Sequence, residues 1–280
     1  MKRKRKLQKT LIFLLLCGLV VVFLTPIFFV LMNSFKGRFY ISDMPFALPK
    51  GELFAGDENY ITGIDKTNFF AAFGWTTFIT VGSVLVIVLF TSMTAWYITR
   101  VKTKSSEIMY YAFVFSMVVP FQMIMFTMSK LADMLKLNTP LGMIVLYLGF
   151  GAGLSVFMFC GFVKSIPLEI EEAAMIDGCS PVKTYFQIVF PILKPTAITV
   201  AILNAMWIWN DYLLPYLVIG VATPYKTIPV AVQYLMGSYG AKDYGSLMAL
   251  LVLSIIPIIV FYISCQKYII EGVVAGAVKG

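Results

Sequence analysis

Six apolar runs, each long enough to cross a lipid bilayer, constrain the fold of this chain more than any other feature. They cover approximately residues 11–32, 73–99, 108–128, 141–163, 196–220 and 247–265. A helix rises about 1.5 Å per residue, so about 20 apolar residues cross a hydrocarbon core of about 30 Å. Helices satisfy every backbone hydrogen bond internally, as that core requires. The sequence therefore predicts an all-α polytopic membrane protein with six transmembrane helices.

The composition supports a bilayer as the solvent. Hydrophobic residues make up 60% of the chain and charged residues 13%, against about 45–50% and about 25% in a soluble domain. The net charge is +8, but the basic residues flank apolar runs. We interpret them as topology signals and contacts to anionic lipid, not as a nucleic-acid surface. The chain has no His and no C-x-x-C pair, so we expect no metal site, disulfide framework or cofactor.

The first apolar run follows a basic segment, as in a signal peptide. It extends over residues 11–32, however, whereas the apolar part of a signal peptide has about 7–15 residues. Leu16 before Cys17 is too bulky for lipoprotein processing. We therefore expect an uncleaved first span. The expected regions are a basic N-terminus (1–10), the first span with an external loop (11–72), a permeation core (73–265) and a C-terminal tail (266–280).

The distribution of basic residues predicts the orientation of the spans. With a cytoplasmic N-terminus, fourteen Lys and Arg residues lie inside and eight outside, the bias expected for inner-membrane proteins. The fourteen are Lys2, Arg3, Lys4, Arg5, Lys6, Lys9, Arg100, Lys102, Lys104, Lys164, Lys183, Lys194, Lys267 and Lys279. We expect a multi-pass protein of the plasma membrane with both termini in the cytoplasm. Loops 33–72 and 221–246 would be external, with Gly237, Gly240 and Gly245 providing tight turns in the second.

The inside loop at residues 164–195 carries strong helix punctuation. Pro167 suits a first helical turn, and acidic residues follow where the helix dipole favours them. Gly178 stands where a left-handed residue commonly ends a helix. Ser180 and Pro181 then restart a helix as N-cap and first-turn residue.

The second helix of this loop is expected to be amphipathic. Its apolar face would hold Val182, Tyr185, Phe186 and Val189, spaced i, i+3, i+4 and i+7. Such a helix pair needs a surface to pack on. It could lie on lipid, pack on the chain's own spans, or dock onto a cytoplasmic partner. The acidic residues at its start oppose the lipid interpretation, because the inner leaflet is usually anionic.

The loop resembles the EAA signature of ABC-importer membrane subunits. That signature reads E-A-A, three residues, G, nine residues, I, two residues, P. The matching residues are Glu172, Ala173, Ala174, Gly178, Ile188 and Pro191, and Asp177 supplies the frequent D-G pair. The segments "VVPFQMI" (118–124), "WNDYLLPYLV" (209–218) and "IIEGVVAGAVKG" (269–280) resemble sugar-importer permeases, specifically the shorter, six-span partner of the maltose-type heterodimer.

This resemblance implies a coupling helix that inserts into a cleft of an ATPase subunit. It assigns Glu172, Ala173, Ala174, Asp177 and Gly178 to that contact. The implied partners are a second permease subunit, an ABC ATPase dimer, an extracytoplasmic substrate-binding protein facing loop 221–246, and membrane lipid. ATP would be bound and hydrolysed by the partner, because this chain has no G-x-x-x-x-G-K-[ST] loop. We therefore expect no catalytic residues and no enzyme activity in this chain.

Polar and aromatic residues gather in the fifth apolar run. They are Asn204, Trp207, Trp209, Asn210 and Asp211. An Asp at a span centre costs about 2.5–3.5 kcal/mol, so it should face a cavity or a partner. Aromatic faces with amide and carboxylate groups suit a sugar path. The alternative is that these groups hydrogen-bond between helices. Gln122, close to Pro120, is a further candidate for the substrate path.

The function predicted from the sequence is import of a sugar or oligosaccharide by alternating access. An importer for another solute remains an alternative, since EAA-bearing permeases carry other cargo. An ion-coupled secondary transporter would need several ionisable groups within its spans, and only Asp211 lies well inside one. An intramembrane enzyme would need a convergent nucleophile, base or metal set, which the sequence does not indicate.

Overall fold

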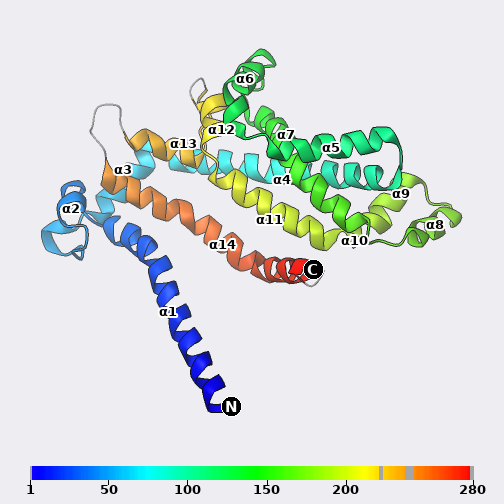
Figure 1. Cartoon of the computed structure of the whole chain (residues 1–280). Helices are drawn as coiled ribbons and strands as arrows, with labels where there is room; N and C mark the ends of the chain where they lie inside the picture. The colour runs from blue at the N-terminus through cyan, green and yellow to red at the C-terminus, as the bar shows by residue number, and fades with distance from the viewer. Residues whose placement is uncertain (1, 221–222, 237–242, 278–280) are drawn as a thin grey trace. The chain divides into compact units, whose positions relative to one another are not determined.

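The computed structural model describes the backbone of residues 2–220, 223–236 and 243–277, and the side chains of residues 6–220, 223–236 and 243–268. Within these ranges the regular secondary structure is helical, and Lys36 and Phe54 form one isolated bridge. The helices labelled in Figure 1 are α1 (Lys2–Asn33), α2 (Arg38–Asp43), α3 (Gly56–Thr67), α4 (Phe69–Arg100), α5 (Lys104–Val118), α6 (Phe121–Met134), α7 (Pro140–Val163), α8 (Leu168–Ile176), α9 (Pro181–Thr184), α10 (Phe190–Ile192), α11 (Lys194–Asn210), α12 (Leu213–Pro215), α13 (Ile228–Gln233) and α14 (Tyr244–Ala277). The prediction of an all-α fold is confirmed.

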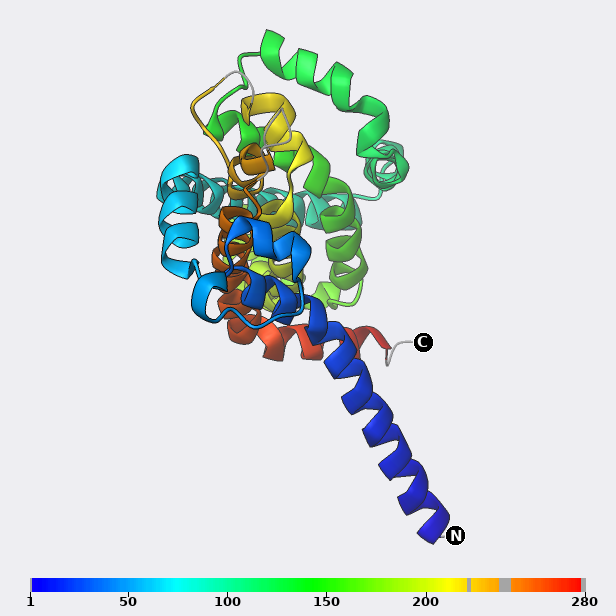
Figure 2. The same cartoon turned by 90° about the vertical axis from the view of Figure 1, so that its left-hand side faces the viewer.

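Of the described helices, α1, α4, α7 and α14 are long and apolar enough to cross a membrane. Two bent helix pairs, if each is counted as one span, bring the number of candidate spans among the described residues to six. These pairs are α5 with α6, bent by 106°, and Pro181–Ile192 with α11, bent by 75°. The predicted third span therefore breaks near Pro120, which has no backbone N–H and caps α6 in an extended conformation. Figure 2 shows α6 turned away from α5.

The chain forms two compact units, Met1–Phe70 with Ala231–Pro257, and Ala71–Val230 with Ile258–Gly280. In the first unit, the region predicted as an external loop contains α2 and α3. Asn59 of α3 is buried and donates to the carbonyls of Ser34 and Lys36, at 2.8 Å each. A Cβ at Gly245 would collide with the Asn59 amide. Gly245 thus permits close helix packing, not the predicted turn, because it lies inside α14. Gly237 and Gly240 lie outside the described residues.

Lys36 is a fully buried lysine just after α1. Its Nζ donates to the carbonyls of Met44 at 2.9 Å and Pro45 at 3.0 Å. Burial lowers the pKa of this ammonium group. The Lys36 contacts fasten the segment after α1 onto the turn that follows α2.

In the second unit, α7 packs closely against several neighbours. A Cβ at Gly151 would lie 2.7 Å from Ile87 of α4 and 2.8 Å from Asn204 of α11. A Cβ at Gly153 would lie 2.6 Å from Ser116 of α5. These glycines allow α7 to approach three helices, whereas Gly149, four residues before Gly153, has open space around its Cβ position.

Candidate functional site

The candidate coupling segment, residues 168–195 of the predicted inside loop, begins with α8. A Schellman motif closes the C-terminal end of this helix. Gly178 has φ +83°, the left-handed conformation predicted for it. The N–H of Cys179 donates to the carbonyl of Ala174, and the N–H of Gly178 donates to that of Met175, at 3.0 Å each. Ser180 then caps α9, accepting from the N–H of Lys183 at 3.4 Å. The predicted helix, bend and restart are confirmed.

The two faces of α8 differ in what they contact. Glu171 and Ala174, three residues apart, are buried within the chain. Glu172 and Ala173, which the sequence assigned to an ATPase contact, are exposed, and so are Asp177 and Gly178. Two apolar side chains join this exposed set, with Met175 49% and Ile176 85% exposed. Of the five residues expected to touch a partner, Ala174 alone lies on the inner face.

Glu171 is held by a charge-assisted network at the end of α4. Arg100 donates from Nε and Nη2 to Oε1, at 2.9 and 2.7 Å. Trp96 donates from Nε1 to Oε2 at 2.9 Å. Nη2 of Arg100 also reaches the carbonyl of Ile166 at 3.0 Å. Glu171 therefore does more than favour the helix dipole: it fastens the first turn of α8 to α4.

The second half of the segment is a π-helical turn at Tyr185–Val189, between α9 and α10. Tyr185 and Val189 are buried, as predicted, but Val182 is 64% and Phe186 45% exposed. Two residues of the predicted apolar face therefore pack within the chain, and the other two do not. The buried side of the segment continues at spacings of four, from Tyr185 through Val189 to Leu193.

The polar residues of α11 divide into two groups. Asn204 is buried and donates to Ser155 of α7 at 3.2 Å and to the carbonyl of Val200 at 2.9 Å. Asn204 thus joins two helices, the alternative that the sequence left open. Asn210 is exposed and donates to the carbonyl of Met206 at 2.7 Å within its own helix.

Asp211 marks a break in the predicted fifth span. It follows α11 with extended φ and ψ, and its Oδ1 accepts from the N–H of Leu213 at 3.0 Å. Its Oδ2 accepts from the hydroxyl of Tyr147 at 3.0 Å. The ring of Tyr147 meets that of Trp207 edge-on, with centroids 5.5 Å apart. The structure therefore brings Asp211 and Trp207 together through a tyrosine of α7. We call Tyr147, Trp207 and Asp211 the Asp211 group.

The remaining candidates lie apart from this group. Gln122 is exposed on α6, and no described interaction connects it to Asp211 or Trp207. Trp209 packs edge-on against Phe73 of α4, with centroids 5.9 Å apart.

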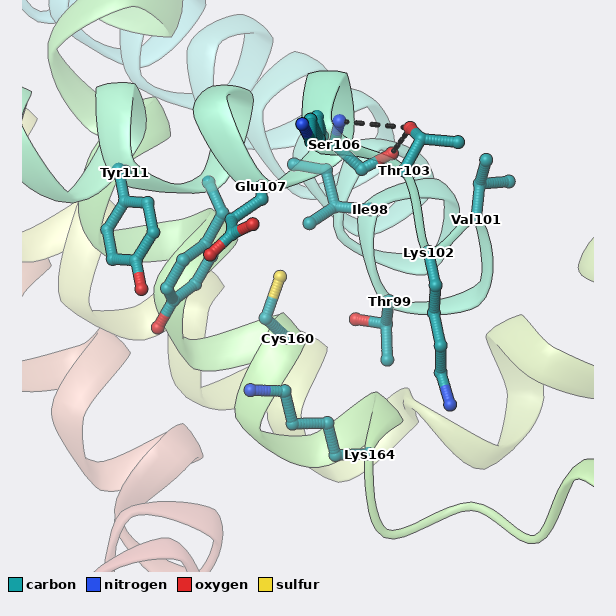
Figure 3. Close-up of a pocket in the computed structure, with 12 residues that line it drawn as sticks. Ile98, Thr99, Val101, Lys102, Thr103, Ser106, Glu107, Tyr111, Cys160 and Lys164 are labelled. Carbon is teal, nitrogen blue, oxygen red and sulfur yellow. Dashed lines mark hydrogen bonds between the residues drawn. The ribbon is translucent and has the colours of Figure 1, made fainter.

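A pocket of about 530 Å³ opens where the end of α4, the start of α5 and the end of α7 meet. In Figure 3, Glu107 and Tyr111 project from α5, Cys160 projects from α7, and Lys164 directly follows α7. Lys164 lies over the ring of Tyr110, with Nζ 5.5 Å from the centroid. The pocket contains none of the sequence-predicted site residues.

Sequence reasoning missed Arg100, Trp96 and Tyr147 as functional candidates. Arg100 entered only as a topology charge, and the two aromatic residues sat inside apolar runs. The spacing of four between Trp96 and Arg100 was the available signal, because it places both on one face of a helix. For Tyr147 no comparable signal exists, since its partner is 64 residues away.

These features define a multi-pass helical membrane protein with a structured loop fastened to one end of a span. The chain belongs to the family of binding-protein-dependent transport system inner membrane components, whose model matches residues 88–274. The match includes the coupling segment, the Asp211 group and the last turns of α4, from residue 88 to Arg100.

Comparison with known proteins gives relatives along the whole chain. The chain is 40% identical to the probable starch degradation products transport system permease protein AmyC of Thermoanaerobacterium thermosulfurigenes, over 99% of both chains. It is 35% identical to the multiple sugar-binding transport system permease protein MsmG of Streptococcus mutans, over 100% of both. Its fold matches a chain of a bacterial ABC transporter involved in alginate import, with a TM-score of 0.72, 21% identity, and 95% and 98% of the two chains covered.

Proposed function

We propose that this chain is one permease subunit of an ATP-binding-cassette importer that moves a sugar or oligosaccharide into the cytoplasm by alternating access. ATP is bound and hydrolysed by a separate ATPase dimer. A second permease and an extracytoplasmic substrate-binding protein complete the importer. Both termini and the coupling segment lie in the cytoplasm. The family to which the chain belongs supports this assembly.

The observation that carries the proposal is the exposed face of α8. A short helix closed by Gly178 presents an acidic side chain, Glu172, beside a small one, Ala173. Next to them Ile176 is 85% exposed. Met175, which is 49% exposed, extends this apolar surface, and an exposed apolar patch rimmed by polar residues is typical of a protein contact site. Glu172 offers a charge to a basic group on the ATPase, and Ala173 allows close approach.

A carbohydrate cargo is supported by the relatives and by the Asp211 group. The names of two full-length relatives refer to starch degradation products and multiple sugars. In this chain, Trp207 is 42% exposed and stands beside the Tyr147–Asp211 hydrogen bond. An accessible indole face next to a carboxylate provides the stacking and hydrogen bonding that a sugar requires.

The test is uptake by the reconstituted importer with its ATPase and binding protein. Oligosaccharide uptake should require ATP and fall to background in Glu172→Lys, which reverses the docking charge. A cysteine at Met175, with Cys17, Cys179 and Cys265 replaced by serine, should crosslink to the ATPase. A cysteine at Leu141, exposed at the far end of α7, is the matched control and should not. Uptake driven by an ion gradient without an ATPase would contradict the proposal.

A further inference from the structure

One face of α4 contacts the coupling segment at three successive turns. Ser92, Trp96 and Arg100 are spaced four residues apart, so they form one stripe along the helix. We call these three residues the α4 stripe. Each makes a polar contact or a ring contact with the coupling segment, although that segment lies more than 65 residues further along the chain.

The contacts cover both halves of the coupling segment. Arg100 and Trp96 occupy both oxygens of Glu171 on α8. Ser92 and Tyr185 of the π turn share a hydrogen bond of 2.6 Å, and Ser92 and Tyr185 are almost fully buried. The ring of Trp96 lies against that of Tyr185, with centroids 5.4 Å apart. A single span thus holds α8 and the π turn together.

We infer that the α4 stripe transmits displacement of the coupling segment to α4, with Glu171 and Arg100 as positioning residues for transport. This inference rests on the proposed function, because the displacement comes from the ATPase. The exposed face of α8 would receive the partner, and the buried face, through Glu171, would pass the movement to α4.

The chemistry of the Glu171 contact suits a rigid connection. Three N–H groups converge on one carboxylate whose side chain is 3% exposed, and the guanidinium side chain is 18% exposed. An ion pair shielded from water resists separation more than an exposed pair does. Arg100 also holds the Ile166 carbonyl just before α8. The start of α8 therefore cannot move away from α4 without breaking several bonds together.

A second side of α4's last turns borders the pocket. Ile98 and Thr99 follow Trp96 by about 200° and about 300° around the helix axis, at about 100° per residue. Both line the pocket of about 530 Å³ in Figure 3. The end of α4 is thus fastened on one side and borders open volume on another. Packed cores resist displacement, so a helix end beside a pocket is the easier one to shift.

The experiment compares Glu171→Gln with Glu169→Gln in the reconstituted importer. Glu169 is an exposed acid of the same helix, so the control removes an equal charge outside the network. We measure ATP hydrolysed, sugar transported, and crosslinking from the cysteine at Met175. Glu171→Gln should keep the crosslink and ATP hydrolysis but lower the sugar transported per ATP by about fivefold or more, the usual range for coupling between sites.

A conservative variant separates positioning from charge. Arg100→Lys keeps the positive charge but loses the guanidinium, which reaches Oε1 of Glu171 and the Ile166 carbonyl together. Its sugar-to-ATP ratio should lie between that of wild type and that of Glu171→Gln. If Glu171→Gln does not accumulate, Tyr185→Phe takes its place. This change removes only the tyrosine hydroxyl that hydrogen-bonds to Ser92, and it should lower the sugar-to-ATP ratio less than Glu171→Gln. A sugar-to-ATP ratio equal to that of wild type in these variants would overturn the inference. Absence of ATP-driven uptake in the wild-type importer would instead refute the proposed function.

Discussion

Two carboxylates of the second unit, Glu171 and Asp211, are satisfied in different ways. Glu171 is enclosed by Arg100 and Trp96, so its charge has a cation at 2.7 Å. Asp211 accepts from neutral donors, the Tyr147 hydroxyl and the Leu213 amide, at 3.0 Å each. The ion pairs among the described residues are Arg100 with Glu171 and Lys66 with Asp243, so Asp211 takes part in none of them.

The two sets of hydrogen-bond partners suit different roles for the two acids. An ion pair between buried groups fixes two helices strongly, which suits a connection that must carry movement. A carboxylate held by neutral donors exchanges partners more readily, because a sugar hydroxyl can replace the tyrosine hydroxyl. We therefore propose that Glu171 fastens α8 to α4 and that Asp211 exchanges hydrogen bonds with the substrate.

The largest effect is expected for Glu171→Ala. This change leaves the Arg100 guanidinium largely buried without its partner, which should lower the free energy of unfolding by about 3 kcal/mol. Thermal unfolding in detergent measures the loss. Glu171→Gln keeps two hydrogen-bonding atoms in place and should lose less. Equal stability of wild type and Glu171→Ala would show that the ion pair does not fasten α8.

A smaller loss is expected for Asp211→Ala. The hydroxyl of Tyr147 and the N–H of Leu213 then lack their acceptor, at a cost of about 1–3 kcal/mol. Asp211→Asn retains one acceptor oxygen and is the matched control. A loss as large as that of Glu171→Ala would remove the distinction between the two acids. Sugar uptake in Asp211→Asn, measured beside stability, reports whether the charge itself serves transport.

Gly178→Val tests the bend that positions the exposed face of α8. No atom lies within 4 Å of a Cβ at this position, so the cost is conformational. A left-handed backbone costs an ordinary residue about 1–2 kcal/mol. Gly178→Asn should be milder, because Asn tolerates this conformation. Uptake should fall in the order wild type, Asn, Val, and identical uptake for Asn and Val would refute the requirement for φ +83°.

The smallest effect concerns an exposed ion pair in the first unit, Lys66 with Asp243 at 2.8 Å. Burial raises the pKa of Asp243, but hydrogen bonds from Lys66 and Ser246 outweigh it and lower the pKa. A lowered carboxyl pKa gives stability above the unfolded value of about 4, lost as pH falls through the folded pKa.

Asp243→Asn should therefore lower stability at pH 7 by about 0.5–1 kcal/mol, since the lysine is exposed. The difference between wild type and variant should shrink below pH 4. Thermal unfolding of both proteins across this range measures it. A difference that grows in acid would have the wrong sign and would exclude the Lys66 contact as its source.

Much of the membrane fold and the coupling bend could be predicted from the sequence, because both depend on local patterns. Span length follows from apolar runs, and Gly178, Ser180 and Pro181 carry their backbone preferences with them. Spacing predicted the apolar face after Pro181, but it could not show that Tyr185 and Val189 pack within the chain while Val182 and Phe186 stay exposed. Similarly, Gly245 serves packing against Asn59, which no local pattern shows.

The sequence by itself determined that this chain resides in a lipid bilayer, that its fold is all-α, and that its inside loop bends at Gly178. Tertiary structure alone decided that Glu171 turns inward to Arg100 while Glu172 turns outward, and that Tyr147 meets Asp211. The physical reason is distance along the chain. Backbone preference and hydrophobic periodicity act over a few residues, whereas these contacts join groups 64 to 75 residues apart.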